Sequence, residues 1–301
     1  MTDYAWLDTV DIAELRALLT AVSAVDGRPS MPDGDGVPGD FHGGVYLFAR
    51  RDDELVGCVH LDGRSDSRSV AELVVRPADR RQGIGTELAG RLLARLGIDP
   101  AAEPADRVRV WAHGDQPAAA AVAARFGFRN VRTLLRLRRD LTGALPTASL
   151  PAGVHLRAFR PGRDEDGFVE VNRLAFAWHP EQGALTADGV RAAEAESWFD
   201  AAGFLLAVDD DDRIVGFHWT KVHPDGGDGL PMGEVYVVGV RPDAQGGGLG
   251  RGLTMAGLHY LRQRRGMTRV MLYTESDNRP ALAVYEKLGF TAWDADVQYA
   301  H

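Results

Sequence analysis

Two glycine-rich segments of the chain could bind a phosphate group. Both fit the pattern V-R-P-x-x-[R/Q]-x-x-G-[I/L]-G, once at residues 75–85 and again at 240–250, 165 positions later. Each segment follows a β-branched run and opens a helix-like stretch, so its glycines fall where a strand turns into a helix. Backbone N–H groups that point out of a helix N-terminus suit a pyrophosphate. One such loop would be a weak indication, but a duplicated loop is a strong one.

A second repeated block indicates that the whole chain is duplicated. Residues 115–128 match residues 277–290 without a gap, and both stretches end in G-F. The length of 301 residues agrees with two domains of about 150 residues each. Linker composition surrounds residues 144–150. We therefore predict an N-terminal domain over 1–143 and a C-terminal domain over 151–301.

Each copy predicts the same order of elements around its glycine-rich loop. A strand hairpin comes first, at 45–61 in one copy and at 204–220 in the other. The motif strand follows, and then a helix, a further strand and a second helix that ends at G-F. Helical apolar spacing also covers residues 11–25. The Gly/Pro/Asp-rich stretch 27–44 is interpreted as a flap over a ligand, with disorder as the alternative.

Composition and charge exclude several functional classes. A formal charge of −9 and a pI near 5.5 argue against a nucleic-acid partner, because backbone binding needs clustered cations. The arginines at 132, 136, 138 and 139 are interpreted as the solvent face of a strand. Neither a membrane-spanning run nor a basic leader segment is visible, so we expect a cytoplasmic protein without a membrane partner.

Cysteine and aspartate usage gives no indication of a metal site. Cys58 is the one cysteine, which excludes an internal disulfide, and its strand-like surroundings predict a buried apolar side chain. Four successive aspartates at 209–212 could suggest a metal loop. No partner with ligand spacing follows them, so they are interpreted as a solvated hairpin turn.

The motifs together resemble the GCN5-related N-acetyltransferases (GNAT family). The resemblance rests on a strand followed by [R/Q]-x-x-G-x-G and a helix, and then on D-N-x-x-A-x-x-x-Y-x-x-L-G-F, and it covers nearly the whole chain. It implies an α/β fold of two tandem GNAT domains with mixed sheets, and acetyl-CoA as co-substrate without another cofactor. A phosphate-loop NTPase is excluded because neither loop ends in G-K-[S/T]. The glycine spacing also disfavours a dinucleotide-binding fold.

Three further blocks narrow the resemblance to tandem family members that acetylate the cysteinyl amine of Cys-GlcN-inositol. They are A-F-A-W-H-P-E-Q-G from 175, G-F-H-W-T-K-V-H-P-D from 216 and G-E-V-Y-V-V-G-V from 233. The Ala-, Arg-, Gly- and Asp-rich composition fits a GC-rich genome. The resemblance nominates acceptor-binding residues that are acidic or hydrogen-bonding: Glu181, Lys221, Glu234 and Tyr273. Asp33, in the Gly-rich flap, is expected to reach the acceptor from the first domain.

The resemblance also implies which residues contact acetyl-CoA. The family pattern puts backbone N–H groups around Val238 and Val240 beside the acetyl group. The implied contacts in the second copy are Val238, Gly239, Val240, Gln245, Gly246, Gly247, Gly248, Leu249, Gly250, Arg251, Asn278, Arg279, Pro280, Ala281, Leu282 and Ala283. The matching positions in the first copy are Val74, Val75, Arg76, Gln82, Gly83, Ile84, Gly85, Thr86 and Glu87.

The duplication allows a comparison of the two copies as catalysts. Acetyl transfer to an amine requires a base for the amine and an acid for the departing thiolate. The resemblance assigns these roles to Glu234 and Tyr285, which align without a gap with Ser69 and Ala123. Glu72 is three positions beyond Ser69 and is expected to face the other way. We therefore predict a catalytic C-terminal domain and an N-terminal domain that binds acetyl-CoA or serves as a scaffold.

Structural alternatives exist for both catalytic candidates. Glu234 could form a strand-edge salt bridge, and Tyr285 could be a packed helix aromatic. Period-two geometry predicts that Glu234, Tyr236 and Val238 line one cleft from one strand face.

Two other functions share most of the motifs. One is acetylation of a protein N-terminus or another small amine, and the other is a non-catalytic CoA-binding sensor. The two copies can pack as an internal pseudo-dimer, which predicts a monomer.

Overall fold

A single sheet of twelve strands runs through the computed structural model of the chain. The structure describes all residues except 27–42, 63–67, 178–184 and 227. The strand order is β1-β2-β3-β4-β5-β12-β6-β11-β10-β9-β8-β7. The N-terminal half consists of β1 (Thr2–Leu7), α1 (Ile12–Asp26), β2 (Val45–Arg51), β3 (Glu54–Leu61), β4 (Ser69–Val75), α2 (Ile84–Arg95), β5 (Val108–His113), α3 (Pro117–Arg125) and β6 (Arg129–Asp140).

The C-terminal half repeats this order with one additional helix. Its elements are β7 (His155–Ala158), α4 (Glu165–Ala175), α5 (Ala187–Glu194), β8 (Phe204–Val208), β9 (Ile214–His223), β10 (Met232–Val240), α6 (Leu249–Gln263), β11 (Arg269–Glu275), α7 (Arg279–Lys287) and β12 (Thr291–Ala300). The predicted hairpins, motif strands and flanking helices are all present. The aspartates at 209–212 form the β8–β9 turn, and Cys58 is buried.

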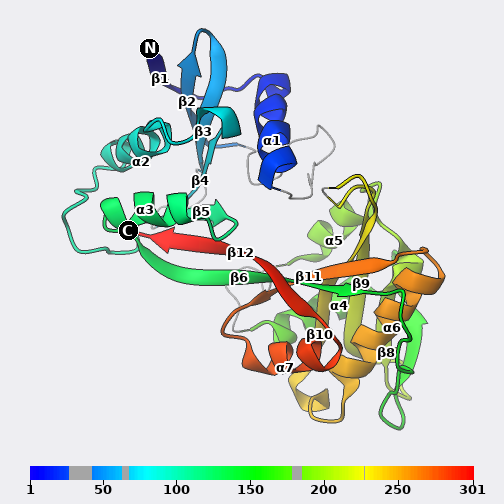
Figure 1. The fold of residues 1–301 in the computed structure, drawn as a ribbon. Coiled ribbons are helices and arrows are strands. Elements are labelled where there is room, and N and C mark those ends of the chain that lie inside the picture. The colour runs from blue at the N-terminus through cyan, green and yellow to red at the C-terminus, as the bar shows by residue number, and fades with distance from the viewer. Residues whose placement is uncertain (27–42, 63–67, 178–184, 227) are drawn as a thin grey trace.

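The two halves exchange their final strands. β12, from the C-terminal half, lies between β5 and β6 of the N-terminal half, and β6 pairs in turn with β11. Figure 1 shows β6 and β12 running side by side from one half to the other. The segment 144–150 is irregular, as expected for a linker, but the sheet continues across the two halves. The limits of the two domains therefore stay a prediction.

The exchange changes the interpretation of the arginines on β6. The stretch is a strand, as predicted, but its arginines do not simply face solvent. Arg136 is 1% exposed and the side chain of Arg132 is 13% exposed. Side chains of the neighbouring strands cover them, because Tyr273 and Trp293 lie against Arg136 and Glu275 pairs with Arg132.

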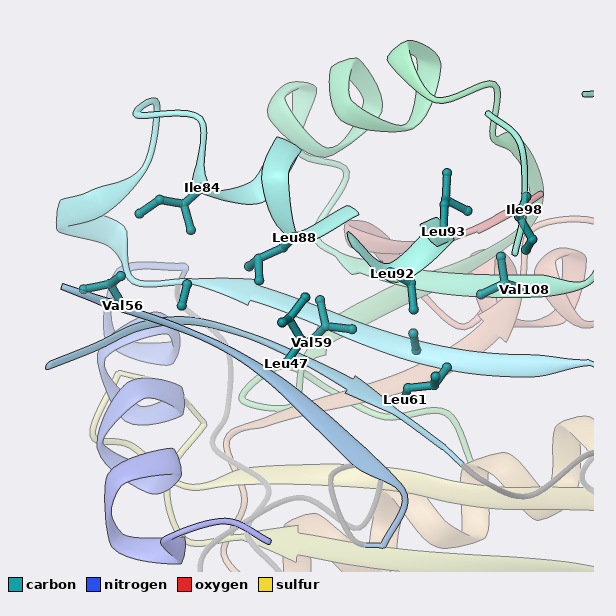
Figure 2. Packing of buried hydrophobic residues seen from close by; sticks show 12 residues of the cluster. Leu47, Val56, Val59, Leu61, Ile84, Leu88, Leu92, Leu93, Ile98 and Val108 are labelled. Atoms are coloured by element: carbon teal, nitrogen blue, oxygen red, sulfur yellow. The ribbon is translucent and has the colours of Figure 1, made fainter. Parts of the chain in front are cut away.

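Apolar side chains hold the helices against the sheet. In the N-terminal half, Leu88 and Leu92 of α2 point onto Leu47 and Val59 of the sheet (Figure 2). Ile84, Leu88 and Leu92 recur every four positions, which gives α2 one apolar face. Full burial of each contributes about 1.5–3 kcal/mol. The packing fixes the N-terminus of α2 beside the end of β4.

Both glycine-rich loops adopt the same backbone. A short 3-10 turn, Pro77–Asp79 or Pro242–Ala244, follows the motif strand in each half. Gly83 and Gly248 precede the two helices with φ of 85° and 81°. A Cβ at either glycine would meet nothing within 4 Å, so backbone conformation rather than crowding favours glycine there.

Candidate active site

Strands β10 and β11 separate in the middle of the C-terminal half. Their parallel pairing extends from Gly233–Val270 to Val235–Leu272, although β10 continues to Val240. The N–H of Arg241 bonds to the carbonyl of Val215 on β9 at 2.9 Å. Because N–H groups alternate in direction along a strand, those of Val240 and Val238 point the other way, into the opening. These are the two N–H groups that the family pattern implies.

A β-bulge lies at the start of this opening. The register of β10 against β9 shifts between Val235 and Val237, so Tyr236 is the additional residue. The expectation that Glu234, Tyr236 and Val238 share a face is therefore wrong. Glu234 and Tyr236 face Lys221, whereas Val238 packs under α6.

The bulge also corrects the gapless comparison of the two motif strands. Ser69 pairs with Val108, and Gly233 pairs with the equivalent residue Val270. The structural counterpart of Glu234 is therefore Val70, one position from the predicted Ser69. The N-terminal half still has no carboxylate at this position, because Val70 is apolar.

Glu234 is held on the sheet by a histidine. Its side chain is buried, and its carboxylate bonds to Nε2 of His223 at 2.6 Å. Lys221 is its direct partner across the β9–β10 ladder. A buried carboxylate with one hydrogen-bonded imidazole keeps other lone pairs available, so the pair could accept a proton.

Aromatic rings surround the ammonium group of Lys221. Its Nζ lies 4.3 Å from the ring centroid of Trp198 and 5.3 Å from that of Tyr236. Trp198 follows α5, so a third element contributes to this cluster. On the next strand, Tyr273 stands beside the guanidinium of Arg136. The predicted residues Lys221, Glu234 and Tyr273 thus lie on one face of neighbouring strands.

Tyr285 lies on the opposite face of the same sheet. It projects from α7 into the apolar cluster beneath α6, with its ring 5.7 Å from that of Phe290. Burial raises the pKa of Tyr285 to about 12, so the phenol keeps its proton at neutral pH. Glu234 and Tyr285 therefore lie on either side of the strand opening. The structural alternatives for the two residues are therefore partly correct. Tyr285 packs in an apolar cluster, and Glu234 pairs with His223.

Asn278 begins the helix that carries Tyr285. Its Oδ1 accepts a hydrogen bond from the N–H of Ala281 at 3.3 Å, which caps α7. The residues after it, through Ala283, form the first turns of the helix. This segment therefore has a structural role in addition to the predicted contact with acetyl-CoA.

A chamber of about 1520 Å³ connects the two halves. In the N-terminal half it extends from Gly83 and Thr86 at the start of α2, along the β4–β5 opening, to Glu72. It ends among residues of the C-terminal half that include Trp198, Lys221, Tyr236 and Tyr273. Lys221 and Tyr273 therefore line the cavity that opens from the other half, whereas Glu234 is not among its lining residues.

The two glycine-rich loops differ in side chains. Arg80 and Gln245 are equivalent, and each donates to the carbonyl of the preceding valine, Val75 or Val240, at 3.1 Å. Arg80 also forms a two-bond ion pair with Asp26 of α1. At the next position the first loop has Arg81 with φ of 65°, where the second has Gly246 with φ of 91°. A left-handed conformation is less favourable for arginine than for glycine.

Glu72 belongs to a charged cluster in the N-terminal half. Nε2 of His113 bonds to its carboxylate at 2.8 Å, and Nδ1 lies 3.6 Å from Asp296 of β12. Burial opposes the charge of His113, but the two carboxylates raise its pKa to about 10. Glu72 is two positions from Val70 and shares its face, so the expected opposite orientation is wrong.

Two predicted acceptor residues, Asp33 and Glu181, lie outside the described residues, as does nearly all of the proposed flap. Sequence reasoning missed Trp198, His223, His113 and the chamber-facing role of Arg136. A repeat comparison does not reveal them, because they meet through the bulge and the exchanged strands. Within the described ranges no group of three or more possible metal ligands occurs, and no helix is long and apolar enough to span a membrane.

Comparison with known proteins identifies the family. The model of the acetyltransferase (GNAT) family matches residues 170–290, and that of the acetyltransferase (GNAT) domain matches residues 42–130. The mycothiol acetyltransferase of Actinosynnema mirum is 54% identical over 100% of both chains. This chain belongs to the mycothiol acetyltransferase family. A second member, from Saccharomonospora viridis, is 50% identical over 100% of this chain and 99% of its own.

Two solved structures have a fold similar to that of this mycothiol acetyltransferase family member over nearly its whole length. A GCN5-related N-acetyltransferase from Sphaerobacter thermophilus has a TM-score of 0.71 at 23% identity, covering 99% of this chain and 95% of its own. A tandem GNAT protein from the clavulanic acid biosynthesis pathway has a TM-score of 0.69 at 20% identity, covering 100% and 98%. The predicted family, tandem α/β fold and acetyltransferase class are confirmed.

Proposed function

We propose that the C-terminal half transfers the acetyl group of acetyl-CoA to the cysteinyl amine of Cys-GlcN-inositol, giving mycothiol. The full acceptor name is 1D-myo-inositol 2-(L-cysteinylamino)-2-deoxy-α-D-glucopyranoside. The relatives above are named mycothiol acetyltransferases, and this supports the acceptor. The observation that carries the proposal is the strand opening with Glu234 on one side and the protonated Tyr285 on the other.

The opening suits a thioester because it offers donors for a developing negative charge. The N–H groups of Val238 and Val240 stabilise the carbonyl oxygen as the amine attacks. Glu234, supported by His223, takes the proton from the amine, through a water molecule where the amine does not reach it directly. The new C–N bond forms as the C–S bond breaks, and Tyr285 protonates the departing thiolate of CoA.

The glycine-rich loop and α6 hold the nucleotide end of the donor. In α6 the bond from Gly252 N–H to Gly248 carbonyl is the first of the helix. The N–H groups of Leu249 to Arg251 therefore remain for the pyrophosphate. Asn278–Ala283 contact the pantetheine or adenosine end, as the family pattern implies.

The chamber supplies the acceptor site. Lys221 and Tyr273 offer hydrogen bonds for hydroxyl groups, and Trp198 and Tyr236 offer apolar ring faces. Asp33 and Glu181 remain proposed acceptor residues. Because the acceptor has both an amine and a thiol, selectivity for nitrogen comes from positioning the amine at the thioester.

The N-terminal half binds a second acetyl-CoA without turning it over. Its loop and strand opening match those of the C-terminal half, and both of these N-terminal segments line the chamber. The acid and base positions hold Ala123 and Val70, so catalytic groups equivalent to Tyr285 and Glu234 are missing. We further propose that the protein acts as a cytoplasmic monomer.

The test is a turnover assay with acetyl-CoA and purified Cys-GlcN-inositol, with mass and free thiol measured in the product. N-acetylated product with its thiol intact supports the proposal. Absence of product, with acetyl-CoA binding measured separately, contradicts it. Turnover of a protein N-terminus or of another small amine would then identify a different acetyltransferase, and inactivity on all amines would indicate a CoA-binding sensor. Light scattering measures the oligomeric state.

A further inference from the structure

The acceptor side of the chamber includes a buried cation from the N-terminal half. Arg136 lies on β6, directly opposite Tyr273 of β11. Its guanidinium carbon is 5.5 Å from the ring centroid of Tyr273 and 4.6 Å from that of Trp293. Arg136 is 1% exposed, yet it contributes to the chamber lining beside Tyr273 and Lys221. The guanidinium of Arg136 thus contacts the ring of Tyr273, one of the proposed acceptor residues.

The hydrogen bonding of this guanidinium is incomplete. Nη1 donates to Asp294 at 3.3 Å, and Nη2 lies 3.9 Å from the sulfur of Met271. Nε is buried without a hydrogen-bond partner in the structure. A buried N–H group without an acceptor destabilises a folded protein. Stability alone therefore does not account for an arginine at this position.

The other half has a different side chain at the equivalent place. Gln298 of β12 stands opposite Trp111 of β5, as Arg136 stands opposite Tyr273. Its Oε1 accepts a hydrogen bond from Arg109 at 3.2 Å. The half that lacks the catalytic pair thus has a neutral amide, and the half that contains the pair has a permanent cation. The difference is confined to this strand position, because Arg132 of β6 places a guanidinium 5.2 Å from the ring centroid of Trp111.

We propose that Arg136 is a positioning residue of the acceptor site, which it serves by fixing the ring of Tyr273 at the chamber wall. This inference rests on the proposed function of the C-terminal half. A planar cation over an aromatic face restricts the ring through electrostatic attraction and contact area. Because β6 belongs to the first copy, the N-terminal half completes the acceptor site of the second.

Steady-state kinetics of Arg136→Met test the proposal. Methionine fills similar space without charge or N–H groups. We expect the KM for Cys-GlcN-inositol to rise about tenfold, with kcat and the KM for acetyl-CoA within about twofold of wild type. We expect Tm to stay the same or rise, because the unpartnered N–H is removed. Arg136→Lys keeps a cation near the rings, so the acceptor KM should be intermediate.

Gln298→Met is the matched control, and we expect it to leave the acceptor KM unchanged. A double-mutant cycle with Tyr273→Ala tests the route of action, because Arg136→Met should add little once the ring is absent. An unchanged acceptor KM in Arg136→Met, or full additivity in the cycle, overturns the inference. No product from the wild-type enzyme contradicts the proposed function instead, so the two failures are distinguishable.

Discussion

The two halves of this protein share a backbone and differ at four functional positions. Both have a strand opening and a glycine-rich loop with a left-handed glycine before the helix. Where the second half has Glu234, Tyr285 and Gly246, the first has Val70, Ala123 and Arg81. At the exchanged strands, Arg136 of β6 faces the second half and Gln298 of β12 faces the first. Under the proposed function, the donor-binding framework persists in both copies after duplication, and the proposed proton-transfer groups are in one copy only.

The comparison also shows that the halves are not independent. β6 pairs only with strands of the C-terminal half and β12 only with strands of the N-terminal half, and the chamber takes lining residues from both halves. The experiments that follow separate what belongs to one half from what the halves share.

Cutting the chain should produce the largest effect. A fragment of residues 151–301 lacks β6, so β11 loses one neighbour and β12 loses both. We expect this fragment to lack a cooperative urea transition and acetyltransferase activity, because unpaired strand edges promote aggregation. Coexpression with residues 1–150 should restore both. Cooperative unfolding of the isolated fragment, monitored by circular dichroism, would show that the exchange is dispensable.

Removal of either proton-transfer group should lower kcat by about 10²- to 10⁴-fold, the usual contribution of general acid–base catalysis. Tyr285→Phe keeps the packing against Phe290, and Glu234→Gln keeps a hydrogen-bond acceptor for His223. Stopped-flow or steady-state assays at saturating substrates measure the effect. Glu72→Gln in the first half is the comparison variant for Glu234. Unchanged turnover in both Tyr285→Phe and Glu234→Gln would remove the catalytic assignment.

Replacement of the two left-handed glycines, Gly83 and Gly248, by valine should distinguish the roles of the two proposed acetyl-CoA sites. Gly248→Val is expected to raise the KM for acetyl-CoA about tenfold, because a β-branched residue is strained at positive φ and the loop must shift. Gly83→Val is expected to weaken acetyl-CoA binding at the N-terminal half while changing that KM less than twofold. Isothermal titration calorimetry counts the sites. Equal effects of both variants on turnover would contradict the division of roles.

The smallest effect concerns the pH dependence of stability. Because the folded-state pKa of His113 is about 10, above the ordinary value of 6.5, its stabilisation is complete below pH 6.5 and is lost as pH rises toward 10. We expect Tm to decline over this window, and less steeply in His113→Gln. Parallel Tm–pH curves for the two proteins would exclude this contribution.

The sequence was sufficient to predict the helices and strands of each copy. The same motifs occur in both copies, so each copy supports the prediction made for the other. It was not sufficient for the strand pairing between the copies. A repeat does not show whether β12 pairs with β11 of its own copy or with β5 of the other copy. One inserted residue, Tyr236, shifted the match of Glu234 from Ser69 to Val70 and reversed the expected face of Glu72. The chamber residues Trp198 and Arg136 come from elements that meet only in three dimensions.

The exchanged strand also determines the order in which the sheet can be completed during synthesis. β5 has to wait for its neighbour β12 until the whole C-terminal half has been translated. The nascent N-terminal half therefore leaves the ribosome with β5 and β6 unjoined. Pairing between such distant segments is slow, and open strand edges attract other chains during the delay. The same crossing that unites the halves thus leaves the edges of β5 and β6 open to other chains until the second half has been made.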